Sequence, residues 1–129
     1  MYCLDSSIFI PLLRGDKDIK KKLDSMEPEN VSITTITLCE LFRGAFKSRD
    51  TKNDLETVHK LIRDYKTFLF DIESSETFGE DFVNLEKSGK PTQVLDLMIA
   101  SIAKSNNLIL VTRNKKHFEN IQDLKIEEW

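Results

Sequence analysis

The fold is decided by one apolar stretch that holds a single carboxylate, Val94-Leu95-Asp96-Leu97-Met98-Ile99-Ala100-Ser101-Ile102-Ala103. In an α-helix, the residues three, four and seven positions after Asp96 share its face, and these are Ile99, Ala100 and Ala103. A second apolar row is formed by Leu95, Met98 and Ile102. A helix that is apolar nearly all round is predicted to be buried. Because an unpaired carboxylate is costly there, Asp96 is expected to be neutralised, hydrogen-bonded near the helix start, or facing a cation.

The strongest strand prediction follows this helix, at Leu108-Ile109-Leu110-Val111, an unbroken apolar run of the kind buried on both faces of a sheet. Shorter apolar runs predict strands at residues 2–4, 31–33, 68–70 and 124–126, the last at a sheet edge. Helices are predicted between them, over residues 8–13, 16–26, 35–45, 55–65 and 76–87. A parallel strand pair needs a crossover connection, so this alternation indicates an α/β fold. We expect three layers, α/β/α, around a mostly parallel sheet of four to five strands.

Serine residues mark two of the expected helix starts. Ser6 or Ser7 is the expected N-cap of the first helix, and Ser74 or Ser75 that of the helix ending near residue 87.

Length and composition bound the class of protein. The 129 residues form one predicted domain, 1–129, with 40% hydrophobic residues and no apolar run near the ~18 residues of a membrane span. The first residues contain no basic segment followed by an apolar one, so a cytoplasmic protein with no membrane association is expected. Cys3 and Cys39 lie in apolar segments without ligand spacing, which predicts buried free thiols. The net charge of −3 argues against a generally basic nucleic-acid-binding surface but allows a local basic patch.

Three acids and one asparagine are predicted to meet at one sheet edge. Asp5 ends the first strand, Asn114 follows the strand at 108–111, and Glu40 and Asp96 lie early in their helices. The carboxyl ends of parallel strands are where open α/β sheets bind ligands. Carboxylates brought together repel one another, and they are stable when they hold a proton or a hard cation. Oxygen ligands favour Mg²⁺ or Mn²⁺, which can activate a water molecule and stabilise the transition state of phosphodiester hydrolysis.

Each acid also has a simpler explanation. Asp5 could serve only as the N-cap of the following helix, and Glu40 could be an exposed acid paired with Arg43 three residues later. Asp96 could be a partly exposed acid near a helix N-terminus, where the helix dipole favours negative charge. The occurrence of all three at one predicted edge favours a shared site.

Four short motifs, in the same order along nearly the whole chain, resemble those of PIN-domain ribonucleases of the VapC type, the toxins of type II toxin-antitoxin pairs. The opening Leu4-Asp5-Ser6-Ser7-Ile8 is similar to the family's apolar strand followed by Asp-Thr/Ser-Asn/Ser. Residues 37–45 resemble the second motif, a Glu followed four residues later by Gly-Ala. Residues 89–91 with 95–100 resemble the third motif, and residues 110–114, 117–119 and 124–129 the C-terminal one.

The resemblance implies that Asp5, Glu40 and Asp96 are catalytic metal ligands. Asn114, a further predicted catalytic residue, stands where many PIN domains have a fourth acid. An amide oxygen adds no charge, so the occupancy of a second metal position stays open, and Glu119 could compensate.

Basic side chains near the expected site are candidate RNA contacts. Arg113, beside the site, and Arg43 are the predicted phosphate contacts. His59 is expected on a helix surface, and His117 at the surface or behind the metal ligands.

The function predicted from these residues is a Mg²⁺- or Mn²⁺-dependent endoribonuclease toxin. The resemblance also implies a homodimer and a cognate VapB-like antitoxin. Two alternatives remain open: a PIN-fold module with weak or no catalysis that binds RNA or antitoxin, and an aspartyl-phosphate phosphatase or receiver-like domain. The second alternative is disfavoured because a phosphatase needs an acid two residues after the first Asp, where this chain has Ser7.

Overall fold

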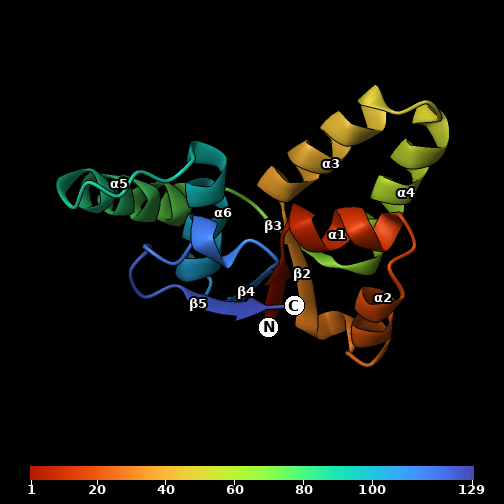
Figure 1. Ribbon diagram of the computed structural model, residues 1–129, viewed down its shortest axis with the longest axis horizontal. Coiled ribbons are helices and arrows are strands. Elements are labelled where there is room, and N and C mark those ends of the chain that lie inside the picture. Colours follow the sequence, from red (N-terminus) through yellow and green to blue (C-terminus); the bar gives the residue numbers. More distant parts are fainter.

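The protein is built on one five-stranded parallel sheet, described here from a computed structural model of residues 1–129 (Figure 1). The strands are β1 (Tyr2–Leu4), β2 (Val31–Thr34), β3 (Lys66–Phe68), β4 (Ile109–Thr112) and β5 (Lys125–Glu128). Their order in the sheet is β3-β2-β1-β4-β5, and every neighbouring pair is parallel. The chain adds β2 and β3 on one side of β1, then crosses to add β4 and β5 on the other. The order therefore reverses between β1 and β4, the place where open α/β sheets form a ligand crevice.

Six α-helices cover the sheet. They are α1 (Ser6–Leu13), α2 (Lys17–Asp24), α3 (Thr35–Lys47), α4 (Thr51–Asp64), α5 (Ile72–Lys87) and α6 (Val94–Ser105). Two short 3-10 helices, η1 (Pro28–Asn30) and η2 (Lys115–His117), complete the chain. Figure 1 shows α1 to α4 gathered on one side of the sheet, with α5 and α6 on the other. The three-layer α/β/α prediction is confirmed.

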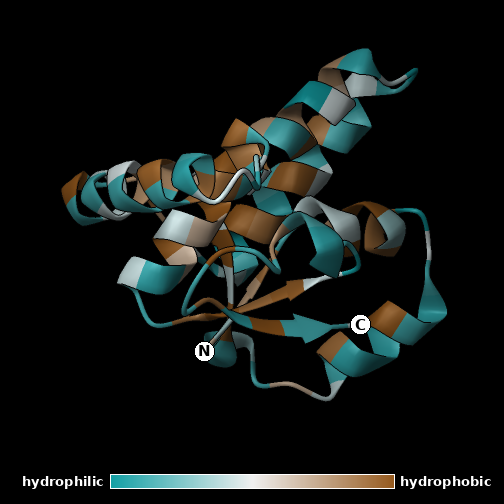
Figure 2. Ribbon diagram, turned by 60° about the vertical axis from the view of Figure 1, so that its left-hand side comes forward, coloured by the Kyte–Doolittle hydropathy of each residue, from teal (hydrophilic) through white to brown (hydrophobic).

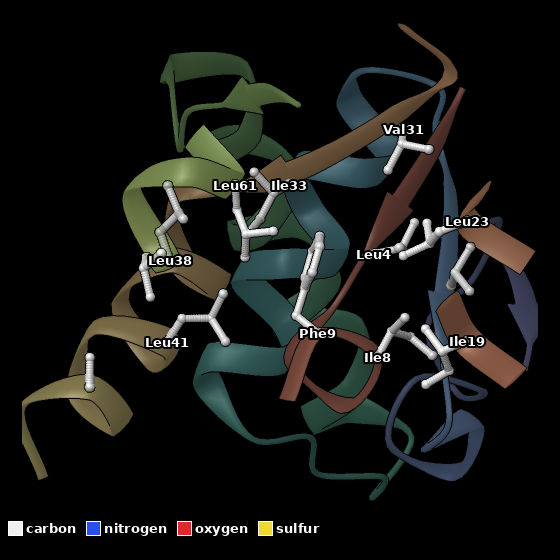
Figure 3. Close-up of a cluster of buried hydrophobic side chains, with 13 residues drawn as sticks. Leu4, Ile8, Phe9, Ile19, Leu23, Val31, Ile33, Leu38, Leu41 and Leu61 are labelled. Carbon is white, nitrogen blue, oxygen red and sulfur yellow. The ribbon is translucent and has the colours of Figure 1, made fainter. Parts of the chain in front are cut away.

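Two hydrophobic cores lie on the two faces of the sheet, because neighbouring strand residues point in opposite directions. Leu4 and Val111 belong to the core under α1 to α4, and their neighbours Cys3 and Leu110 belong to the core under α5 and α6. Figure 3 shows the first core, in which α1 and α2 bring side chains such as Ile8 against Leu4. All five residues named here are buried.

Acidic residues begin several helices where serines were predicted to do so. The N-cap of α1 is Asp5, whose side chain accepts the Ser7 backbone N–H, and that of α5 is Asp71, which accepts from Ser74. The predicted serine caps are therefore wrong by one to four positions. A carboxylate at this position satisfies a free backbone N–H and also interacts favourably with the helix dipole.

Three further predictions need correction. The third strand was expected at residues 68–70 but lies at Lys66–Phe68, because its position is set by pairing with β2 while it lies at an exposed edge. The central helix is not buried all round, since Val94 and Leu95 at its start are about half exposed (52% and 48%). Cys39 is exposed, whereas Cys3 is buried as predicted.

The helices of the protein also bear on membrane insertion. None combines the length and the apolar composition that crossing a bilayer requires.

Candidate functional site

Asp5 lies at the point where β1 ends and α1 begins. Asp5 as a whole residue is 4% exposed. Oδ1 accepts hydrogen bonds from the backbone N–H of Ser7, at 3.0 Å, and from the Ser7 hydroxyl, while Oδ2 accepts the Thr112 hydroxyl at 2.6 Å. A carboxylate has about four acceptor positions, so these bonds leave roughly one free on Oδ2. Helix capping is thus one role of Asp5, and it leaves room for a further ligand.

Thr112 and Ser7 join the carboxyl ends of β1 and β4. The buried Thr112 hydroxyl donates to Asp5 and accepts the Asn114 backbone N–H at 2.9 Å. Ser7 Oγ lies 3.2 Å from Thr112 Oγ1 and accepts the Arg113 backbone N–H at 2.8 Å. These bonds fix the position of the Asp5 carboxylate. The role of Thr112 was not predicted, although a polar residue at the carboxyl end of a buried strand is a signal for it.

Asp96 lies in the first turn of α6, with 15% of its side chain exposed. Its Oδ2 atom is 3.2 Å from Nδ1 of His117, which follows β4 in the short helix η2. Asp96 was expected to be neutralised, hydrogen-bonded near the helix start, or facing a cation. In the structure it lies near the helix start with His117 as its polar partner. The pairing with His117 was not predicted, because the two residues meet only through the packing of η2 beside α6.

Glu40 projects from α3 and is half-buried. Its Oε2 atom is buried and has no hydrogen-bond partner. None of the four ion pairs of the structure involves Glu40, so the simpler explanation, an exposed acid paired with Arg43, is wrong. Glu40 also lines a groove of about 400 Å³ between α1, α3 and α4. A buried carboxylate oxygen without a partner is costly, so this atom marks a position where a ligand would be stabilising.

The three acids share one electrostatic environment. Burial is the largest cause that raises the pKa of Asp5, and the negative charge of Asp96 adds to it, while hydrogen bonds from Ser7 and Thr112 oppose it. Burial also raises the pKa of Glu40, with smaller contributions from the charges of Asp96 and Asp5, while a side-chain hydrogen bond with Ser6 opposes the shift. The pKa of Asp96 is raised by burial and opposed by His117. The acids predicted to gather at the sheet edge are therefore close enough to repel one another.

The carboxylate oxygens of Asp5, Glu40 and Asp96 are the kind of donor that hard divalent cations prefer. In the present side-chain arrangement, no three His, Cys, Asp or Glu residues converge closely enough to hold an ion between them. The free position on Asp5 Oδ2 and the unpartnered Glu40 Oε2 are nevertheless the kind of oxygen that Mg²⁺ or Mn²⁺ binds. A cation would offset the repulsion that adds to the pKa values of Asp5 and Glu40, and to hold it the side chains would have to come closer together.

The remaining predicted site residues are exposed. Asn114 is connected to the site through its backbone N–H, with its side chain at the surface. Arg113 forms an ion pair with Asp16 at 2.9 Å, and Arg43 is exposed on α3. Glu119 is also exposed. The structure thus places the three acids within electrostatic range of one another, without convergence on one point, and leaves the asparagine and both arginines exposed.

The family model for the PIN domain matches residues 2–124. The chain belongs to the PIN-domain family. This PIN-domain protein is 30% identical over 131 residues to "Ribonuclease VapC1" of Haemophilus influenzae strain R2866, a match that covers 100% of this chain and 98% of the relative. It is 27% identical to the "tRNA(fMet)-specific endonuclease VapC" of Shigella flexneri, with 99% and 97% of the two chains covered.

A solved structure shares the whole fold of this PIN domain. It is VapBC2 of Rickettsia felis bound to a DNA fragment from its promoter, with a TM-score of 0.91 and 27% identity over 99% of this chain and 98% of that one. The resemblance seen in the motifs is confirmed over the full chain. Membership in the PIN-domain family makes the phosphatase and receiver alternatives wrong.

Proposed function

We propose that this protein is a divalent-metal-dependent endoribonuclease of the VapC type. Asp5, Glu40 and Asp96 would hold the metal, which when bound supplies a water nucleophile and stabilises the charge of the transition state at phosphorus. Thr112 and Ser7 orient Asp5, and His117 holds Asp96. The observation that carries the proposal is the buried, unpartnered Glu40 Oε2 beside two other acids whose charges raise its pKa.

The names of the relatives guide the choice of substrate and partner. The Shigella relative is named for cleavage of tRNA(fMet), so a tRNA is the first substrate to test. Two of the similar solved structures are VapBC complexes, and we propose a VapB-like antitoxin as the partner of this chain. We further propose that the protein is a homodimer and acts on RNA in the cytoplasm.

The test is cleavage of tRNA by the purified protein with and without Mg²⁺ or Mn²⁺. We expect cleavage only with metal, and its loss in Asp5→Asn, Glu40→Gln and Asp96→Asn. The matched control is Glu56→Gln, an exposed acid on α4, which should cleave like the unmodified protein and so exclude a contaminating nuclease. Cleavage that persists in all three site variants would contradict the assignment of the acids.

The alternative of a non-catalytic binding module makes a different prediction. Such a module would bind RNA or antitoxin while showing no cleavage with either metal. The shared electrostatics of the three acids favour the nuclease, since a binding module gains nothing from acids whose charges raise one another's pKa.

A further inference from the structure

A second groove lies next to the acidic site, with a volume of about 440 Å³. Its lining consists of Asp18, Ile19, Lys21, Lys22, Arg113 and Trp129. Figures 1 and 2 show that the end of β5 lies beside α2, the two elements that form the groove. The backbone N–H of Trp129 donates to the carbonyl oxygen of Thr112 at 3.3 Å, and the Thr112 hydroxyl bonds to Asp5. The groove therefore starts one residue away from the acid network.

Cations outnumber acids among the residues that line the groove, although the chain carries a net charge of −3. Three cations line it, Lys21, Lys22 and Arg113, against one lining acid, Asp18. Arg113 is paired with Asp16, but this ion pair is at the surface, with side chains 38% and 25% exposed. None of the four ion pairs of the structure involves Lys21 or Lys22. These lysines are therefore free to bind an anion, and the exposed Arg113 pair is weak enough to be exchanged.

An aromatic ring lies among these cations. Trp129 is the only tryptophan of the chain and is half-buried. Lys22 Nζ lies 5.1 Å from the centre of its ring, and the indole N–H donates to Glu127 at 2.9 Å. The ring is thus fixed at its edge, and the group that covers its face is a flexible lysine. Because an exposed lysine–ring contact is weaker than the stacking of a nucleobase, a base can displace Lys22 from the ring.

We infer that this groove binds a nucleotide of single-stranded RNA that flanks the scissile bond. The base stacks on Trp129. Lys21 and Lys22 contact the phosphates, and Arg113 connects the groove to the acidic site. A cationic groove with an aromatic platform is how proteins bind single-stranded nucleic acid with little sequence preference. This inference rests on the proposed ribonuclease function and extends its substrate contacts. An acidic protein segment would use the lysines but not the ring face, so RNA accounts for more of the groove.

The single tryptophan provides a direct probe of the groove. Titration of the intact protein with a short oligouridylate, without divalent metal, should quench Trp129 fluorescence in a saturable way. Lys21→Ala and Lys22→Ala should each weaken binding and reduce the slope of log affinity against log salt by about 0.7, the value for one phosphate contact on a single strand. Lys87→Ala, at the end of α5 on the opposite side of the molecule, is the matched control and should leave the slope unchanged.

Stacking is tested by substitution of the ring, with labelled RNA as the readout. Trp129→Ala should weaken binding about tenfold or more, and Trp129→Phe by less, because phenylalanine keeps a smaller stacking face. Trp129 also packs against the core, so thermal unfolding must show that the variants are folded. Lys21→Ala, on an exposed face of α2, tests the groove independently of the ring, because the lysine that covers the ring is Lys22, and it should raise KM for a long RNA.

The inference would be overturned by the absence of quenching with RNA, or by lysine variants whose RNA affinity and salt slope equal those of Lys87→Ala. Equal quenching and affinity with polyglutamate would also overturn it, because they would assign the groove to an acidic protein segment. The test also separates the two proposals. Groove binding without metal-dependent cleavage would contradict the ribonuclease function, while cleavage that is independent of Lys21, Lys22 and Trp129 would contradict only the groove.

Discussion

At the scale of single residues, the site is a balance between buried acids and the groups that hold them. Asp5 is held by Ser7 and Thr112, and Asp96 by His117, but Glu40 keeps one oxygen without a partner. Burial raises all three carboxyl pKa values, and the charges of neighbouring acids raise those of Asp5 and Glu40 further, so the metal-free site opposes folding at neutral pH. Activity and stability should therefore respond in opposite directions when one acid is removed.

Asp96→Asn should lower the rate of RNA cleavage more than about 100-fold. Loss of a residue that only orients a metal ligand costs about 10- to 100-fold, and we expect loss of a ligand itself to cost more. The same change should raise the midpoint of thermal unfolding of the metal-free protein at neutral pH, since it removes a buried charge. Cleavage assays and calorimetry on one preparation measure both effects. A variant that loses activity because it is less stable than the unmodified protein would return Asp96 to a purely structural role.

The pH dependence of stability follows from the direction of the same pKa shifts. A carboxyl whose pKa is raised by folding binds its proton more tightly in the folded state, so stability falls as pH rises from the ordinary value, 3.8 for Asp and 4.5 for Glu, through the raised one. The advantage of Asp96→Asn should accordingly be largest at neutral pH and vanish below pH 3.8. Unfolding midpoints measured across this range provide the test, and an advantage independent of pH would contradict it.

His117→Ala should reduce activity or metal affinity about 10- to 100-fold, the range found when a group that orients a metal ligand is removed. The physical reason is that Asp96 loses the partner 3.2 Å from its Oδ2 atom. His59→Ala, an exposed histidine on α4, is the control. Metal titration of each variant measures the effect, and equal affinities would show that His117 does not position Asp96.

At the scale of elements, α5 and α6 are held together by a nearly buried ion pair. Lys104 Nζ on α6 lies 2.8 Å from both carboxylate oxygens of Asp81 on α5, which is 5% exposed. A second contact joins the same helices, between the hydroxyls of Ser74 and Ser105 at 3.0 Å. Since α6 carries Asp96, this packing also fixes one arm of the site.

Lys104→Met should destabilise the protein by about 3–5 kcal/mol, because it leaves the Asp81 carboxylate buried and unpaired. The double variant Asp81→Leu/Lys104→Met should recover most of that loss, since two apolar groups can replace a buried pair at little cost. Denaturant unfolding of the three proteins gives the free energies. If the single and double variants were equally unstable, packing rather than charge would be responsible.

At the scale of the whole molecule, the sheet order places the site at an open edge that a partner can cover. The order reverses between β1 and β4, and the groove beside Glu40 opens from this edge between α1, α3 and α4. RNA and antitoxin would both need access to this region. Competition between them is therefore expected.

Co-expression with a VapB-like antitoxin should yield a stable complex in which metal-dependent RNA cleavage is lost. Sedimentation of the free protein should show a homodimer, and removal of the antitoxin should restore cleavage. Undiminished cleavage in the complex would contradict neutralisation at this site.

The layers of the fold were predictable from local sequence patterns, and the same patterns single out Asp5, Glu40 and Asp96 as the candidate site acids. Helical spacing around Asp96 and the unbroken run at Leu108–Val111 mark the central helix and a buried strand, because burial imposes periodicity on local sequence. Strand ends could be placed only approximately: the third strand was predicted two residues late, since an edge strand is half-exposed and its apolar content is a weak guide. The serine caps were wrong because aspartates occupied the same turns.

The groups that hold the acids, and the groove beside them, come from contacts between distant parts of the chain. The bond from Thr112 to Asp5 joins residues 107 positions apart, and His117 meets Asp96 through the packing of separate elements. The meeting of α2 with Trp129, which creates the basic groove, likewise depends on β5 lying next to β4. Such contacts follow from strand order and register. The periodicity of apolar residues along the chain indicates which side of an element is buried. It does not indicate which other element packs against that side, so strand order and register could not be predicted from it.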